Sequence, residues 1–256
     1  MNYQPQPYWN EVAREIRDRS GSKVIAGDDS PYYRYKRQRF ESMLGAIQFS
    51  GKTVLELGPG PGANLRIVQA QSPKRLLACD VSEEMIQLAK ANLNGIADKI
   101  EFMHIDGKRL PLEDGSVEVA FASTVLQHNT EDAMMESILT DLCRVSGNEV
   151  HIFEETNKRK TGTELCMARP VNEYQRICEA AGFELKDVEY ININVSYVVC
   201  GIINKLFNAN SRKEGQPISR LSFALQSLLL PVTRIFDKVF GVRKNLTRMS
   251  FRRKTE

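Results

Sequence analysis

The stretch that decides the fold is Thr53-Val54-Leu55-Glu56-Leu57-Gly58-Pro59-Gly60-Pro61-Gly62-Ala63. Its first residues form a short apolar run of the kind that buried strands use, and the glycines and prolines end that run. Glycine lets the backbone turn sharply and approach a ligand that a Cβ would exclude. A helix predicted from there to about residue 71 would direct its free N–H groups at the loop, which favours a carboxylate or phosphate. The order strand, glycine loop, helix predicts the first unit of a nucleotide-binding sheet, although such a loop alone is weak evidence.

The same alternation of short apolar runs and helical periods continues from about residue 50 to about residue 190, which predicts βαβ units and a parallel sheet. Ser82 is expected to cap one of the helices, and Gly182 to end another. Strands are predicted at 75–80, 100–106, 117–123, 149–155, 185–193 and 246–251, and helices at 10–19, 34–48, 130–145 and 171–181.

The expected fold class is therefore α/β, a Rossmann-like doubly wound sheet of seven strands. Residues 1–49 would form an N-terminal helical cover, with a turn or loop at 27–31, and residues 50–256 the main domain. Within that domain, 197–243 reads as a helical insertion before the last strand, with Pro231 as an expected kink.

Two acids strengthen the nucleotide interpretation. Asp80 ends the second predicted strand about 20 residues beyond the loop, which places a carboxylate beside a bound ribose. Asp106 ends the third predicted strand and would accept a hydrogen bond from an adenine amino group. Both lie at the carboxyl edge of the sheet, where doubly wound folds bind ligands. Because Gly58 to Ala63 also satisfies the pattern G-x-G-x-x-A, a nicotinamide cofactor remains an alternative at this point.

Several motifs together resemble those of the class I S-adenosylmethionine-dependent methyltransferases that act on small molecules or glycans. Residues 54–62 resemble the first motif of that family, and Glu56 matches its acidic residue two positions before the first glycine. The resemblance spans about residues 50–195, and only the turn at 145–148 departs from the usual Pro-Gly-Gly. It continues through 80–85, 106–107, 110–116, 123–128 and 181–183.

The resemblance implies S-adenosylmethionine as cofactor. The glycine loop would lie along its methionine part, and the acid matching Asp80 would hold the ribose hydroxyls. Residues that match Met85, Gly107 and Asp106 would border the adenine, and the end of the fourth strand would approach the methionine end by backbone contacts. The cofactor-binding residues expected on this basis are Glu56, Gly58, Gly60, Gly62, Asp80, Val81, Met85, Asp106, Gly107 and Ser123.

A methyl group on a sulfonium is already activated, so the protein mainly aligns the acceptor and excludes water. A hydroxyl or amine acceptor also needs a base. His128, just past the fourth predicted strand, is the expected catalytic residue, because an intrinsic pKa of about 6.5 suits the task. The alternative is a loop histidine that caps the helix starting near Thr130. His104 and His151 are expected to be packed or hydrogen-bonded inside strands, and no metal site is expected.

Composition limits the partners and the compartment. The net charge of +3 is mild, so no nucleic-acid partner is expected. Five scattered cysteines without a Cys-x-x-Cys pair argue against a disulfide framework and suit a reducing compartment. The start of the chain does not resemble a signal peptide, and no run reaches the roughly 20 apolar residues that span a bilayer. A cytoplasmic protein is expected, with Arg34, Lys36 or Arg39 as candidate contacts for the methionine carboxylate or an anionic acceptor, or as a solvated basic face.

The segment 197–243 carries an apolar helical face that must be buried against something. Packing on the protein's own substrate side or on a second copy, as a homodimer, is the simpler expectation. The sharper hypothesis is a monotopic helix that touches the inner membrane face and would suit a lipid-linked acceptor. Its apolar residues are Leu221, Leu225, Leu228, Leu229, Val232, Ile235, Phe236 and Val239, with Arg220, Arg234, Lys238, Arg243 and Lys244 toward the headgroups.

The sequence thus predicts methyl transfer to an oxygen, less often to a nitrogen or carbon, of a small molecule, glycan or lipid-linked acceptor. Two rivals stay open. One is an NAD(P)-dependent oxidoreductase, which would have no use for an acid at Asp106. The other is a non-catalytic S-adenosylmethionine-binding scaffold that acts through 197–243.

Overall fold

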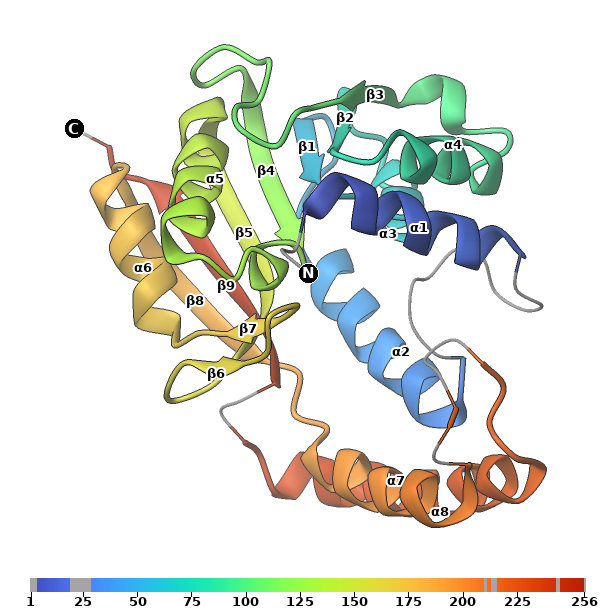
Figure 1. Ribbon diagram of the computed structural model, residues 1–256. Coiled ribbons are helices and arrows are strands. Elements are labelled where there is room, and N and C mark those ends of the chain that lie inside the picture. The colour runs from blue at the N-terminus through green and yellow to red at the C-terminus, as the bar shows by residue number, and fades with distance from the viewer. Residues whose placement is uncertain (1–3, 19–28, 210, 213–215, 243–244, 256) are drawn as a thin grey trace.

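The computed structural model describes residues 4–18, 29–209, 211–212, 216–242 and 245–255. They contain a seven-stranded sheet in the order β3-β2-β1-β4-β5-β9-β8, with helices on both faces (Figure 1). Strands β1 to β5 are parallel, and β9 inserts antiparallel between β5 and β8. This confirms the expected doubly wound, Rossmann-like sheet. The strands are β1 (Thr53–Leu57), β2 (Arg75–Asp80), β3 (Glu101–His104), β4 (Val117–Ser123), β5 (Ser146–Thr156), β8 (Phe183–Tyr190) and β9 (Asn245–Arg253).

The sheet is apolar on both faces because helices cover both. Every residue of β1 is buried, as expected for a central parallel strand. On one face, Leu139 and Tyr174 of the helices α5 and α6 pack on the sheet. On the other face, Leu44 and Leu65 of α2 and α3 do so. The helices that border the sheet are α2 (Pro31–Gly45), α3 (Ala63–Gln69), α4 (Glu83–Asn92), α5 (Asp132–Val145) and α6 (Val171–Ala180).

The chain before β1 forms two helices, as the expected cover requires. Helix α1 (Pro5–Asp18) begins five residues earlier than predicted, since proline is tolerated in a first helical turn, where no intrahelical N–H is lost. Its Ala13 and Ile16 pack against Met85 and Leu88 of α4. Helix α2 begins at Pro31, one residue after its cap Ser30. Of the loop expected at 27–31, residues 27 and 28 lie outside the described part of the chain.

Two helices fill the expected insertion between β8 and β9, α7 (Asn194–Phe207) and α8 (Arg220–Val239). They lie side by side as a layer at one end of the molecule, next to α2 (Figure 1). Helix α8 continues through Pro231. A small hairpin, β6 (Thr161–Gly162) with β7 (Met167–Ala168), follows β5. Its two-residue strands are too short to produce a sequence period, and none was predicted there.

The buried face of α8 differs from the one expected from the sequence. The apolar face was expected to pack on the protein's own substrate side or on a second copy. The first expectation is wrong, because this face is exposed within the chain. Leu225 is half-buried, but Leu228 is 71% exposed and Ile235 64% exposed. The residues that α8 buries are Ser222, Gln226, Leu230, Thr233 and Asp237.

Candidate functional site

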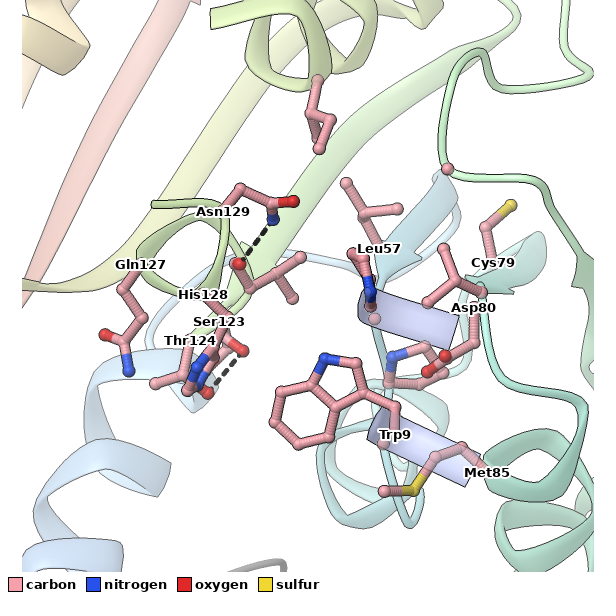
Figure 2. Close-up of a pocket in the computed structure, with 18 of the residues that line it drawn as sticks. Trp9, Leu57, Cys79, Asp80, Met85, Ser123, Thr124, Gln127, His128 and Asn129 are labelled. Atoms are coloured by element: carbon pink, nitrogen blue, oxygen red, sulfur yellow. Dashed lines mark hydrogen bonds between the residues drawn. The ribbon is translucent and has the colours of Figure 1, made fainter. Parts of the chain in front are cut away.

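A cavity of about 830 Å³ opens at the carboxyl ends of β1, β2 and β4, where a doubly wound sheet binds its ligands. Its walls are the glycine loop, the residues after β2 and β3, the turn after β4 and parts of α1 and α2. Figure 2 shows Trp9, Asp80, Met85 and His128 around this space. The predicted site residues Glu56 and Gly62 do not line the cavity. Those that do line it are Gly58, Gly60, Asp80, Val81, Met85, Asp106, Gly107, Ser123 and His128.

The three glycines of the loop have positive φ angles, and each has a different structural role. A Cβ on Gly58 would overlap the side chain of Val125, so the loop packs closely on the turn after β4. A Cβ on Gly62 would lie 2.9 Å from Leu93, so this residue serves the packing of α3 near α4. Among the described residues, nothing lies within 4 Å of a Cβ on Gly60. The backbone at Gly60 therefore leaves open space inside the cavity for a ligand.

Asp80 ends β2 with a buried carboxylate that the local backbone holds in place. The N–H of Ser82 donates to its Oδ1 at 2.9 Å. Burial raises the pKa of Asp80 to about 6, while backbone hydrogen bonds from Ser82, Gly60 and Val81 act in the opposite direction. Ser82 is also the cap of α4, as predicted, since its Oγ accepts from the N–H of Met85 at 3.0 Å. One short turn thus fixes both the acid and the start of the helix.

An apolar slot lies beside Asp80. Met85 and Ile105 are buried, and both line the cavity with Val81. Gly107 approaches Val81 closely, because a Cβ on this glycine would lie 3.2 Å from Val81 Cγ1. Asp106 is exposed at the rim, and the N–H of Lys108 donates to its Oδ1 at 2.9 Å, which keeps the pKa of that carboxyl below its usual value. The predicted adenine-binding residues therefore gather in one place.

Glu56 lies beneath the loop, fully buried. Its Oε1 accepts from Asn64 Nδ2 at 2.8 Å, and its Oε2 is buried and has no hydrogen-bond partner in the part of the chain that the structure describes. Burial raises the pKa of Glu56 to about 8. Because Asn64 does line the cavity, it connects this buried acid to the site, an arrangement the sequence did not indicate.

The turn after β4 is held by one buried carboxylate, Glu154 of β5. Its Oε1 accepts from the N–H groups of Val125 and Leu126 at 2.9 and 2.8 Å, and its Oε2 from that of Gln127 at 3.0 Å. Burial raises the pKa of Glu154 to about 8, and the three N–H donors oppose this shift. The backbone of the turn is thereby fixed in front of the glycine loop.

His128 ends this turn, and its ring is fixed by two contacts. Its Nδ1 lies 2.7 Å from the carbonyl oxygen of Leu165. A carbonyl only accepts, so Nδ1 carries the proton and Nε2 keeps its lone pair. The Trp9 ring meets the imidazole edge-to-face at a centroid distance of 4.9 Å. Burial lowers the pKa of His128, so the imidazole is neutral near pH 7.

The alternative role of His128, as a helix cap, does not agree with this geometry, since the ring contacts Leu165 and the cap position of α5 is Glu131. The other two histidines lie as expected. His104 Nε2 is 3.1 Å from the carbonyl oxygen of Val81, and His151 Nδ1 is 3.0 Å from Ser250 Oγ.

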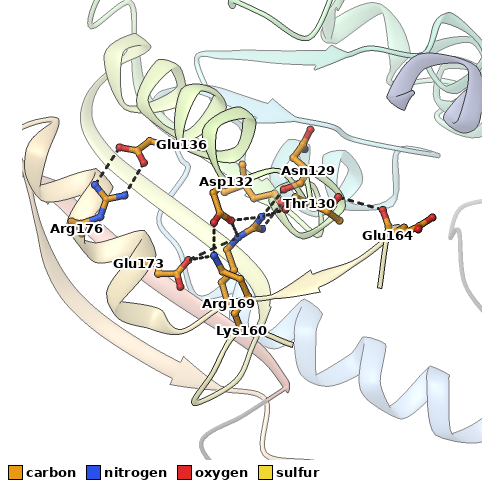
Figure 3. Close-up of polar contacts among 10 residues, drawn as sticks. Asn129, Thr130, Asp132, Glu136, Lys160, Glu164, Arg169, Glu173 and Arg176 are labelled. Carbon is orange, nitrogen blue, oxygen red and sulfur yellow. Dashed lines mark hydrogen bonds and ion pairs between the residues drawn. The ribbon is translucent and has the colours of Figure 1, made fainter. Parts of the chain in front are cut away.

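A buried arginine links the turn after β4 to the hairpin and to α5 (Figure 3). Arg169 is fully buried, and its guanidinium donates to the carbonyl oxygens of Leu126, Asn129 and Thr130 at 3.3, 2.8 and 2.9 Å. Its charge is balanced by Asp132, 3.2 Å away. The hairpin that supplies Leu165 is therefore locked to the turn that carries His128.

Several cavity residues come from segments where the sequence offered little signal. Helix α1 contributes Trp9, the single tryptophan of the chain. Helix α2 contributes Lys36, whose Nζ lies 3.5 Å from Glu155 Oε1, another cavity residue. Of the cations singled out in α2, Arg34 instead pairs with Asp29 at 2.8 Å. The candidate cations Arg34, Lys36 and Arg39 were the sequence signal that pointed toward α2, and no signal in the sequence pointed to Trp9.

Comparisons with known proteins agree with this geometry. Residues 54–148 match the family model described as a methyltransferase domain. A probable S-adenosylmethionine-dependent methyltransferase of Mycolicibacterium smegmatis is 26% identical over 176 residues, which cover 66% of this chain and 66% of the relative. This chain spans less than two thirds of the length of the curated relatives it matches.

Solved structures share the fold. Magnesium protoporphyrin IX methyltransferase from Synechocystis PCC 6803, crystallised with bound SAM, superposes with a TM-score of 0.60 at 14% identity and covers 97% of this chain and 95% of its own. The cyclase SpnF superposes with a TM-score of 0.65 at 14% identity over 98% of this chain and 95% of its own. One fold thus serves two reactions, so the reaction must be argued from the site.

Proposed function

Because this chain carries the methyltransferase domain of the class I S-adenosylmethionine-dependent methyltransferases, we propose that it transfers the methyl group of that cofactor to an oxygen of a small acceptor molecule. The observation that carries the proposal is that one cavity is lined by the Gly60 backbone, the Asp80 carboxylate and His128. The first two suit the cofactor, and the third suits removal of a proton from the acceptor.

The residues present fit S-adenosylmethionine. Asp80 offers a buried carboxylate to a ribose diol, and each hydroxyl would donate one hydrogen bond. The apolar slot of Val81, Met85 and Ile105 fits the flat face of an adenine. The open backbone at Gly60 fits the methionine chain. The volume of about 830 Å³ lies in the upper part of the range of about 300–1,000 Å³ for small-molecule sites, which leaves space for an acceptor.

The cofactor would supply a methyl group already activated by its sulfonium. The protein's own part is then to hold the acceptor in line, exclude water and take up one proton. The His128 lone pair on Nε2 suits that last task, since the Leu165 carbonyl occupies the other nitrogen. His128 Nε2 would take up the proton of the acceptor hydroxyl as that oxygen receives the methyl group, and the cofactor would leave as a neutral thioether. Trp9 packs against the imidazole and shields it from water.

Transfer to a nitrogen or carbon is the less favoured version of the proposal, because a base of this kind suits a hydroxyl best. Glycans and lipid-linked molecules belong to the same acceptor class, since both offer hydroxyls. A lipid-linked acceptor gains support from α2, because one side of this helix lines the cavity with Lys36 and Phe40 and the helix also contacts α7 and α8.

Calorimetry with S-adenosylmethionine, S-adenosylhomocysteine and NADH tests the cofactor. We expect binding of the first two and none of NADH. Tight binding of NADH alone would favour the oxidoreductase and contradict the proposal. The reaction is tested by S-adenosylhomocysteine formation with a panel of hydroxyl acceptors, comparing wild type with His128→Ala. Cofactor binding with no turnover on any acceptor would favour the non-catalytic scaffold.

A further inference from the structure

Helices α7 and α8 expose many large apolar side chains, and the surface that these form is called here the α7–α8 face. Among the described residues, every exposed large apolar side chain lies within 197–240, except Met134 and Leu165. Single exposed apolar residues are normal on protein surfaces, but a contiguous group marks a binding surface. The face consists of Tyr197, Val198, Ile202, Leu206, Phe207, Leu221, Phe223, Leu228, Leu229, Val232, Ile235, Phe236, Val239 and Phe240.

The side of α8 that is buried against the protein is polar, which is the reverse of an ordinary surface helix. Asp237 is buried, and its Oδ1 accepts from the N–H groups of Val195 and Ser196 at 2.8 and 3.1 Å. These two residues lie in the first turn of α7, whose N–H groups have no partner within the helix. The Asp237 carboxylate thus caps α7 from within α8.

A second group of polar contacts joins the pair farther along and connects it to α2. Gln226 Nε2 donates to Asn204 Oδ1 at 2.7 Å, and Gln226 Oε1 accepts from the N–H of Tyr32 at 3.3 Å. Ser222 Oγ donates to Asn204 Oδ1 at 3.2 Å. Rotating α8 to bury its apolar side would leave these groups and the first turn of α7 without partners. The apolar side is therefore held outward by the hydrogen bonds of the polar side.

Among the described residues of α7 and α8, the exposed charges are all positive. Lys205, Arg220 and Lys238 are exposed, and Arg220 and Lys238 lie on the same side of α8 at its two ends. In the described part of 194–242, the acidic residue is Asp237, which is buried. Arg234 lies over the Tyr35 ring at 4.3 Å instead of extending outward. An apolar face bordered by cations complements an anionic lipid surface, whereas a second copy would bring like charges together.

We propose that the α7–α8 face binds the surface of an anionic lipid bilayer, with both helices lying in the headgroup region. Helices of this type bury one apolar side to the depth of the headgroup boundary, and lysine and arginine add attraction to anionic lipids. Within the described residues, neither helix is both long and apolar enough to cross a bilayer. The contact is therefore made along the helix sides.

Helix α2 then joins the bilayer contact to the cavity, since it touches α7 and α8 on one side and contributes Lys36 and Phe40 to the cavity on the other.

Flotation of the full-length protein with vesicles tests the contact. We expect binding to phosphatidylcholine vesicles that contain phosphatidylglycerol, and weaker binding to phosphatidylcholine alone. The triple variant L228S/I235S/V239S should lose binding at least about tenfold, because these three side chains are among the most exposed of the face. Since they are exposed, the fold should be retained.

Charge-reversal variants test the cations beside the α7–α8 face. R220E/K238E should weaken binding to the anionic vesicles at least about tenfold. The matched control is K74E/K99E, which reverses two exposed cations just before β2 and β3 and should bind as wild type does. Calorimetry with S-adenosylmethionine should give the same affinity for all four proteins, so a failure at the bilayer is distinguishable from a failure of the proposed function.

Three results would overturn the inference. Wild-type protein that stays unbound with anionic vesicles would do so, as would a triple variant that binds as well as wild type. A dimer in analytical ultracentrifugation that L228S/I235S/V239S dissociates, together with absent vesicle binding, would assign the face to a second copy of this chain.

Discussion

The Nδ1 atom of His128 lies 2.7 Å from the carbonyl oxygen of Leu165, a residue of the hairpin between β6 and β7. This contact decides the tautomer of the imidazole, since the carbonyl requires a proton on Nδ1. A histidine found by its position after β4 thereby becomes a neutral ring with a lone pair on Nε2. The partner is supplied by a hairpin that is remote in sequence, and Arg169 holds that hairpin to the turn.

The first prediction concerns the pKa of His128. Burial lowers the pKa of His128 and also that of His151, so proton NMR titration of the three histidines should show two rings that titrate below the ordinary value of about 6.5. The variant His128→Gln assigns the signal by its disappearance. As the pH falls through about 6.5, the unfolded chain takes up the proton before the folded one. This group therefore destabilises the fold at acidic pH, and His128→Gln should lose less stability there than wild type. A His128 ring that titrates above about 7 would contradict the burial and the tautomer.

The second prediction concerns Asp80. Replacing it with alanine removes two charge-assisted hydrogen bonds to a ribose, each worth about 1.5–3 kcal/mol, so affinity for S-adenosylmethionine should fall about 100-fold or more in calorimetry. Asp98→Ala, at an exposed acid in the turn before β3, is the control and should bind as wild type does. Because burial raises the Asp80 pKa to about 6, wild-type affinity should also weaken as the pH falls below that value. An Asp80→Ala protein with unchanged affinity would refute the assignment of the cofactor site.

The third prediction separates two glycines of one loop. Gly58→Ala combines a positive φ with overlap on Val125, so its free energy of unfolding in urea should fall by more than the roughly 1–2 kcal/mol of the backbone alone. A second substitution, Val125→Ala, should restore part of the lost free energy of unfolding. Gly60→Ala has open space around its Cβ, and should show only the backbone cost while losing cofactor affinity. Equal effects of both variants on stability and on binding would contradict this division of roles.

The fourth prediction compares two arginines drawn in Figure 3. Arg169→Lys replaces a buried guanidinium that donates to three carbonyl oxygens. The free energy of unfolding should therefore fall by about 3–5 kcal/mol. Arg176→Lys is the matched control, because its pair with Glu136 is at the surface and should change little. A stability loss that is the same for both, measured by urea unfolding, would mean that the Arg169 contacts do not hold the turn.

Much of the sheet could be predicted because its signals are local. The runs 53–57, 75–80 and 117–123 have the bounds of β1, β2 and β4, since buried parallel strands are short apolar runs between turn residues. The Ser82 cap could be predicted for the same reason, as its hydrogen bond reaches only three residues along the chain. The ends of β3 and β5 differ by a few residues, because neighbouring strands decide where pairing stops.

Contacts remote in sequence were beyond such reasoning. Nothing local indicates that Trp9 meets His128, or that Glu154 accepts three hydrogen bonds from the turn after β4. The periodicity of α8 correctly indicated an amphipathic helix, yet packing of its apolar side on the protein's own substrate side was the wrong expectation. Periodicity shows that a helix has two unlike sides, but not which side the rest of the protein covers.

By itself, the sequence determined the order of strands and helices, the glycine loop and the acids at the strand ends, because each depends on residues within a few positions of one another. The tertiary structure alone decided the tautomer of His128, the contact of Trp9 with its ring and the outward apolar side of α8. Each of these depends on hydrogen bonds and packing between segments far apart in the chain, and buried polar groups such as Asp237 can outweigh the burial of apolar surface when they have no other partners.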